Sequence, residues 1–135
     1  MRRSIFYFDD EQNMVDLFQD MFGGIYEVRT AITLAEARRI LADCVVDIII
    51  SDQKMPEIEG VQFLREATAL CPDSFRILLT GQAVVLDVMT EIGNGIIHLF
   101  VTKPWTEDQM RQVLERASAT LELRRQGGKQ DGPTV

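Results

Sequence analysis

Five short apolar segments alternate with five longer amphipathic ones along this chain. The apolar segments are expected to be strands, because they are short and rich in β-branched and aromatic residues; they span 5–8, 26–31, 45–50, 75–80 and 96–102. The other segments carry apolar residues at helical spacing; they span 12–22, 33–42, 61–70, 83–92 and 106–125. Strands that alternate with helices predict an α/β fold, a doubly wound parallel sheet with helices on both faces.

Composition and charge exclude several classes of function. The 135 residues include 14 Lys and Arg against 21 Asp and Glu, which gives a formal net charge of −7. We expect no direct binding to nucleic acid, because the phosphate backbone would repel such a chain. No apolar run approaches the roughly 20 residues of a membrane-spanning helix, and the start of the chain does not read as a secretory signal. No membrane association and a cytoplasmic location are therefore expected.

Polar residues stand where four of the five predicted strands end. Asp9 and Asp10 follow the first strand, Asp52 follows the third, Thr80 ends the fourth, and Lys103 follows the fifth. The carboxyl ends of parallel strands meet at one edge of the sheet, where such folds bind their ligands. The sequence therefore predicts three carboxylates, a hydroxyl and an ammonium group close together.

This combination of groups is suited to phosphoryl transfer. Carboxylates this close repel one another unless a cation neutralises them, and oxygen-only ligation suits Mg²⁺ or Mn²⁺. Asp52 can act as a nucleophile. Lys103 can hold the oxygens of the phosphoryl group, and the hydroxyl of Thr80 can donate to it.

In these motifs the chain resembles the receiver domains of bacterial two-component response regulators. The matching residues are Asp9-Asp10-Glu11, then Asp52-Gln53-Lys54-Met55-Pro56 with Gly60, then Thr80-Gly81, and finally Lys103-Pro104. The resemblance implies a flavodoxin-like fold with five strands and five helices. It also implies a receiver domain over residues 1–125, followed by a flexible tail or the start of a linker over 126–135.

The resemblance further assigns roles in chemistry. Asp52 would accept a phosphoryl group from the phosphohistidine of a sensor histidine kinase or a phosphotransfer protein, and lose it by slow self-catalysed hydrolysis. The metal would be held by Asp10, Asp52 and the backbone carbonyl of Lys54, with Asp9 acting through water. Lys54 and Gln82 would line the approach of water to the aspartyl phosphate. We expect the side chain of Lys54 to shield that phosphate and slow its hydrolysis.

In the related domains, the modified aspartate controls a distant surface. Thr80 would move toward the phosphoryl group, and Phe100 would turn into the space that it leaves. The surface formed by the segments 83–92, 96–102 and 106–125 would then meet an output domain or a partner protein, or a second copy of the chain in a homodimer. By position alone, Phe100 could equally be an ordinary core residue.

The switch would not be an enzyme with a diffusible product. Three other functions compete with it. A receiver that docks without phosphorylation would not need all five site residues. An FMN-binding carrier of the same fold would need a loop that accepts phosphate where Asp9, Asp10 and Glu11 stand. A metal-dependent hydrolase with an aspartate nucleophile would need a second acid at position 54, which is lysine.

Overall fold

The computed structural model describes residues 2–43, 45–81 and 85–130. The chain divides into two compact units, residues 1–104 and residues 105–135. The first unit holds the whole sheet and four helices, and the second holds the last helix. Gln82, one of the predicted site residues, lies outside the described residues.

The sheet has five strands, and every pair of neighbours is parallel. The strands are β1 (Ser4–Phe8), β2 (Glu27–Ala31), β3 (Ile48–Asp52), β4 (Phe75–Thr80) and β5 (Leu99–Thr102). Their order across the sheet is β2-β1-β3-β4-β5, which is the flavodoxin-like order of a doubly wound sheet. The predicted fold class is confirmed.

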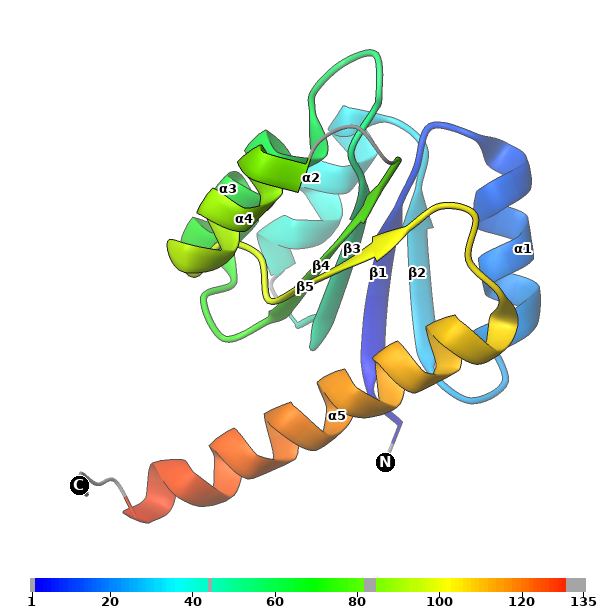
Figure 1. The fold of residues 1–135 in the computed structure, drawn as a ribbon. Helices are drawn as coiled ribbons and strands as arrows, with labels where there is room; N and C mark the ends of the chain where they lie inside the picture. The colour runs from blue at the N-terminus through cyan, green and yellow to red at the C-terminus, as the bar shows by residue number, and fades with distance from the viewer. Residues whose placement is uncertain (1, 44, 82–84, 131–135) are drawn as a thin grey trace. The chain divides into compact units, whose positions relative to one another are not determined.

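Helices cover both faces of this sheet in the first unit. They are α1 (Gln12–Phe22), α2 (Leu34–Asp43), α3 (Gly60–Leu70) and α4 (Val85–Gly93). Helix α1 lies on one face, and α2, α3 and α4 lie on the other (Figure 1). This arrangement buries every residue of β1, β3 and β4, as expected for parallel strands covered on both sides.

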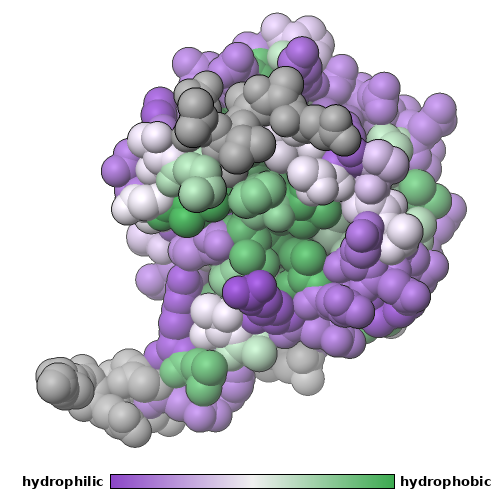
Figure 2. Space-filling model, viewed as in Figure 1, coloured by the Kyte–Doolittle hydropathy of each residue, from purple (hydrophilic) through white to green (hydrophobic). Residues whose placement is uncertain are grey.

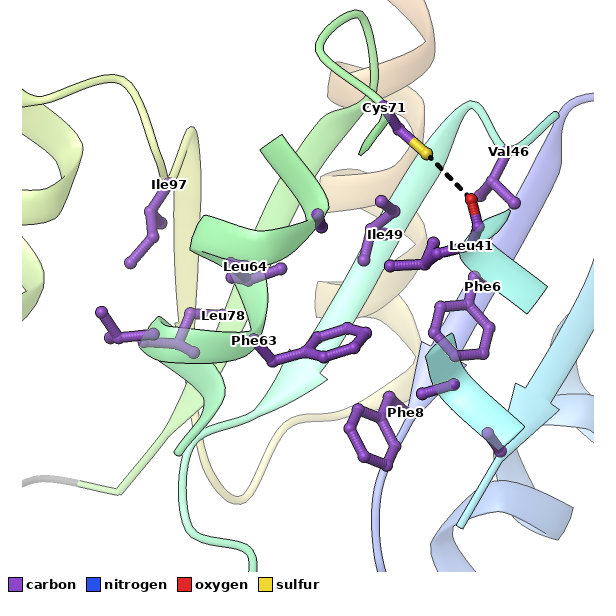
Figure 3. Packing of buried hydrophobic residues seen from close by; sticks show 14 residues of the cluster. Phe6, Phe8, Leu41, Val46, Ile49, Phe63, Leu64, Cys71, Leu78 and Ile97 are labelled. Carbon is purple, nitrogen blue, oxygen red and sulfur yellow. Dashed lines mark hydrogen bonds between the residues drawn. The ribbon is translucent and has the colours of Figure 1, made fainter. Parts of the chain in front are cut away.

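The core on the α2 and α3 face is built around aromatic rings. Phe6 and Phe8 of β1 meet Phe63 of α3, and the ring centroids of Phe8 and Phe63 lie 4.7 Å apart. Leu41 and Ile49 extend the same cluster across α2 and β3 (Figure 3). Because these side chains are almost entirely buried, they fix the strands whose ends form the site described below.

Two strands begin three residues later than the apolar pattern predicts. The third begins at Ile48 rather than residue 45, because the carboxylate of Asp47 turns back to accept the backbone N–H of Ser4 at 2.9 Å. The fifth begins at Leu99 rather than residue 96, because the N–H groups at 96 and 97 donate to the carbonyl of Glu91 at the end of α4.

The helix of the second unit, α5 (Glu107–Gln130), starts where the sequence predicts. Thr106 and Gln109 form a capping box: the Gln109 side chain accepts the N–H of Thr106 at 2.8 Å, and the Thr106 hydroxyl accepts the N–H of Gln109 at 3.1 Å. The helix runs past the expected end at residue 125 to Gln130. The reading of residues 126–135 as a tail or linker stays a prediction.

Candidate functional site

Three carboxylates meet at the carboxyl edge of the sheet, where β1 and β3 are neighbours. Asp9 and Asp10 follow β1, and Asp52 is the last residue of β3. One carboxylate oxygen from each lies within 4.8 Å of those of the other two. Asp9 and Asp52 are buried and Asp10 is exposed. The structure therefore brings together the three acids that the sequence placed at this edge.

Lys103 joins the cluster from the end of β5. Its Nζ donates to Oδ1 of Asp52 at 3.0 Å, and its backbone N–H donates to the carbonyl of Thr80 at 2.9 Å. The Lys103–Pro104 peptide is cis. The ammonium group is thus in direct contact with the residue predicted to be the phosphoacceptor.

Thr80 ends β4, the strand beside β3. The register pairs Asp52 with Leu79, so Thr80 stands at the same edge as Asp52. Thr80 is buried, and its hydroxyl donates to the carbonyl of Gly81 at 3.0 Å. Four strand ends therefore supply the five groups that the sequence analysis named.

Burial makes the ionised state of the carboxylates in this cluster unfavourable. Burial raises the pKa of Asp9 from 3.8 to about 6, and the charges of Asp52 and Asp10 add to the rise, while the N–H of Glu11 and the charge of Lys103 oppose it. Burial also raises the pKa of Asp52, even though the hydrogen bond and charge of Lys103 oppose that rise. One ammonium group does not compensate for the negative charge gathered here.

The same contact stabilises the charge on Lys103. Burial lowers its pKa, but the hydrogen bond and charge of Asp52, with the charges of Asp9 and Glu11, outweigh burial and raise it overall. Lys103 is therefore a permanent cation at neutral pH. It is 31% exposed at the side chain, so an incoming group can reach it.

Asp9 accepts hydrogen bonds from two donors, and the sequence analysis named neither of them. The N–H of Glu11 donates to Oδ1 of Asp9 at 3.0 Å, and the hydroxyl of Tyr7 donates to Oδ2 at 3.4 Å. The signal for Tyr7 was present, because alternate residues of a strand share a face and Tyr7 lies two residues before Asp9.

A second missed residue, Gln53, orders the loop after β3. Its side-chain oxygen accepts the N–H of Val61 at 2.9 Å, and its backbone carbonyl accepts the N–H of Gly60 at 3.0 Å. A Cβ on Gly60 would collide with the carbonyl oxygen of Asp52 and with Leu78. Glycine at position 60 therefore lets the start of α3 approach the backbone of Asp52.

Two further predicted residues have exposed side chains. Lys54 is exposed in the loop after Asp52. Phe100 is 37% exposed, so it is not an ordinary core residue. The register pairs Leu78 with Phe100 and Thr80 with Thr102, and paired residues of parallel strands share a face, so Phe100 lies on the Thr80 side of the sheet. Its switch role stays a prediction.

The donor set fits a hard divalent cation. Three carboxylates offer oxygen atoms within reach of one another, which is the ligand type that Mg²⁺ takes from proteins. The raised pKa values of Asp9 and Asp52 reflect buried charge that such a cation would neutralise. The arrangement can therefore hold a metal beside a carboxylate nucleophile and a lysine.

A flavodoxin-like sheet binds its ligands at the carboxyl ends of its strands, which is where this chain gathers three acids and a lysine. The response regulator receiver domain family matches residues 5–115. The chain belongs to this family, whose members are signalling switches of two-component systems and typically use Mg²⁺ and an aspartyl phosphate.

Its relatives are regulators of the NtrC-like type. The hydrogenase transcriptional regulatory protein HoxA of Bradyrhizobium diazoefficiens is 27% identical over 91% of this chain and 25% of its own length. The transcriptional regulatory protein GlrR of Escherichia coli is 34% identical over 68% of this chain and 20% of its own length. The chain thus spans about a quarter of the relatives it matches.

Solved structures support the same assignment. A response regulator receiver domain protein from Clostridium thermocellum is 27% identical, with a TM-score of 0.83, over 90% of this chain and 98% of that one. Among the residues that the structure describes, no helix has the length and apolar character to cross a membrane.

Proposed function

We propose that this chain is a phosphoacceptor switch in which Asp52 takes a phosphoryl group from a phosphohistidine. The observation that carries this proposal is the contact between Lys103 and Asp52, 3.0 Å from Nζ to Oδ1, beside two further carboxylates. A structural ion pair alone would not need Asp9 and Asp10 gathered around it. In this reading, the chain modifies itself and has no diffusible product of its own.

The chain's own residues would perform the transfer as follows. A carboxylate oxygen of Asp52 forms a bond to phosphorus while the bond from phosphorus to the histidine nitrogen breaks. Lys103 exchanges its contact with Asp52 for one with the phosphoryl oxygens. The hydroxyl of Thr80, which donates to Gly81 before the reaction, turns to donate to the attached group.

Asp9, Asp10, Asp52 and the backbone carbonyl of Lys54 would hold Mg²⁺ or Mn²⁺, with Asp9 acting through water. The metal supplies positive charge that neutralises the acids and the transferred phosphoryl oxygens. Without the metal, the negatively charged phosphoryl group of the donor would approach Asp9 and Asp52. The pKa values of these two carboxyl groups are already raised by burial and by neighbouring carboxylates.

Phosphorylation would change the surface that includes β5, and this surface would contact the output domain or partner. Phe100 and Met89 are both exposed there, at 37% and 57%, and Figure 2 shows apolar side chains on this face of the molecule. Movement of Thr80 would change the space that Phe100 can occupy, one strand away on the same side of the sheet. We propose that α4, β5 and α5 take part in contacts with an output domain, a partner protein or a second copy of this chain.

The donor would be a sensor histidine kinase or a phosphotransfer protein. Residues 1–125 would form the receiver, and residues 126–135 a tail or the start of a linker. The relatives are about four to five times as long as the segment that this chain matches, which supports a place for the receiver within a larger regulator.

Intact mass after incubation with acetyl phosphate tests the function. With Mg²⁺ we expect the gain of one phosphoryl group, lost in base and retained in acid. Asp52→Asn should take up none, and Asp43→Asn, an exposed control at the end of α2, should behave as the wild type. Labelling of Asp52→Asn to the wild-type extent, or labelling of the wild type in EDTA, would contradict the proposal.

A further inference from the structure

Tyr7 is a buried polar residue whose hydroxyl points toward the acidic edge. It lies in the middle of β1 and is fully buried. Its ring stacks on Phe18 of α1, with centroids 4.3 Å apart and an angle of 20° between the planes. This packing leaves the ring little freedom, so the position of the hydroxyl is fixed by the core.

The hydroxyl donates to Oδ2 of Asp9 across 3.4 Å. The other oxygen of Asp9 accepts the backbone N–H of Glu11 at 3.0 Å. Asp9 therefore has a donor at each carboxylate oxygen, one from the backbone of the following loop and one from the core beneath it. Two donors at opposite oxygens define the plane of the carboxylate as well as its position.

A phenylalanine at position 7 would fill the same space and stack on Phe18 equally well. The hydroxyl adds nothing to that stacking, and burying it is unfavourable unless it finds a partner. Burial raises the pKa of Tyr7, and the charges of Asp9 and Asp52 raise it further, so the hydroxyl remains protonated and acts as a donor. Its contribution is the contact with Asp9.

We propose that Tyr7 is a positioning residue of the divalent-cation site, which orients the Asp9 carboxylate from within the core. This inference rests on the proposed metal-dependent function. Groups that hydrogen-bond to metal ligands orient them, and their loss typically weakens metal binding 10- to 100-fold. Because Asp9 would act on the metal through water and the contact with Tyr7 is long, at 3.4 Å, we expect an effect near the lower limit.

Calorimetric titration of the full chain with Mg²⁺, after removal of metals with EDTA, tests the inference. Tyr7→Phe should bind Mg²⁺ about tenfold more weakly than the wild type. The chain has two tyrosines, so Tyr26→Phe is a matched control. Tyr26 precedes β2 and packs near Phe22, at the end of the sheet opposite the acids. This control should bind like the wild type.

A spectroscopic measurement made on the wild type separates positioning from a general effect on the fold. With ¹³C at the ζ-carbon of tyrosine, the wild type gives two signals, which Tyr7→Phe assigns. Saturating Mg²⁺ should shift the Tyr7 signal and leave that of Tyr26 in place, because the Tyr7 hydroxyl donates to a carboxylate of the cluster, whereas Tyr26 precedes β2 at the opposite end of the sheet.

The outcomes distinguish this inference from the proposed function. A wild type that binds Mg²⁺, with Tyr7→Phe binding within twofold of it or with an unmoved Tyr7 signal, overturns the positioning role alone. A wild type that binds no Mg²⁺ overturns the metal site and the positioning role together.

Discussion

Neutralising Asp9 should make the metal-free protein more stable at neutral pH. Asp9 is fully buried, and its pKa is raised from 3.8 to about 6, first by burial and then by neighbouring carboxylates. At about 1.4 kcal/mol for each pKa unit, the shift corresponds to an unfavourable contribution of about 3 kcal/mol when the side chain is ionised. Asp9→Asn removes the charge and keeps an oxygen that can accept the N–H of Glu11, so we expect a gain of about 1–3 kcal/mol.

The dependence on pH follows from the direction of the shift. The folded pKa lies above the unfolded value, so the folded protein binds more protons between pH 3.8 and about 6. The stability of the wild type therefore falls as pH rises through this window. The raised pKa of Asp52 acts in the same direction. The gain in stability of Asp9→Asn over the wild type should be complete above about pH 6 and small near pH 3.8.

Urea unfolding in EDTA, at about pH 7.5 and again at about pH 4, measures this difference. At the higher pH, the urea concentration at the unfolding midpoint should be greater for Asp9→Asn than for the wild type. The dependence of the free energy of unfolding on urea concentration should be unchanged. Asp20→Asn, an exposed change on α1, should leave the midpoint unchanged. Addition of Mg²⁺ should stabilise the wild type more than Asp9→Asn. Equal or lower stability of Asp9→Asn at about pH 7.5, or an equal gain at both pH values, would refute the reasoning.

Three further substitutions test other parts of the account. Gly60→Ala should lower the free energy of unfolding by about 1–3 kcal/mol in chemical denaturation, because a Cβ there meets the carbonyl oxygen of Asp52. Gly24→Ala, with open space around it, should change the free energy of unfolding little. Equal effects of the two substitutions would contradict this prediction. Lys54→Ala should shorten the lifetime of the acyl phosphate, followed by loss of phosphoryl mass, and an unchanged or longer lifetime would remove the proposed shielding. Lys103→Gln should abolish most labelling by acetyl phosphate, since it removes the cation bound to Asp52; labelling at the wild-type rate would show that this contact is only structural.

Local patterns predicted the elements whose limits are set by nearby residues. The bounds of α1, Gln12–Phe22, and of β4, Phe75–Thr80, agree with the structure at both ends, because glycines follow α1 and polar or small residues flank β4. The start of β3 was predicted too early. Asp47 bonds to Ser4, 43 residues away, and no local pattern reveals that contact.

Some residues of the candidate site could likewise be predicted from the sequence, and others could not. The gathering of Asp9, Asp52 and Lys103 follows from topology, because parallel strands deliver their carboxyl ends to one edge. The contributions of Tyr7 and Gln53 depend on where a side chain of a given rotamer ends in space. Tyr7 reaches Asp9 because Phe18 holds its ring, which the sequence alone does not specify.

The central claim is that the acids and Lys103 form one metal-dependent phosphoacceptor that controls a distant surface. Amide chemical shifts recorded with beryllofluoride, a mimic of the phosphoryl group, test it residue by residue. With Mg²⁺ we predict shifts at Asp52, Thr80 and Lys103 that extend to Phe100, and none of these with Mg²⁺ omitted or in Asp52→Asn. Shifts that occur without Mg²⁺, or a spectrum in which Thr80 and Lys103 do not respond, would contradict the account.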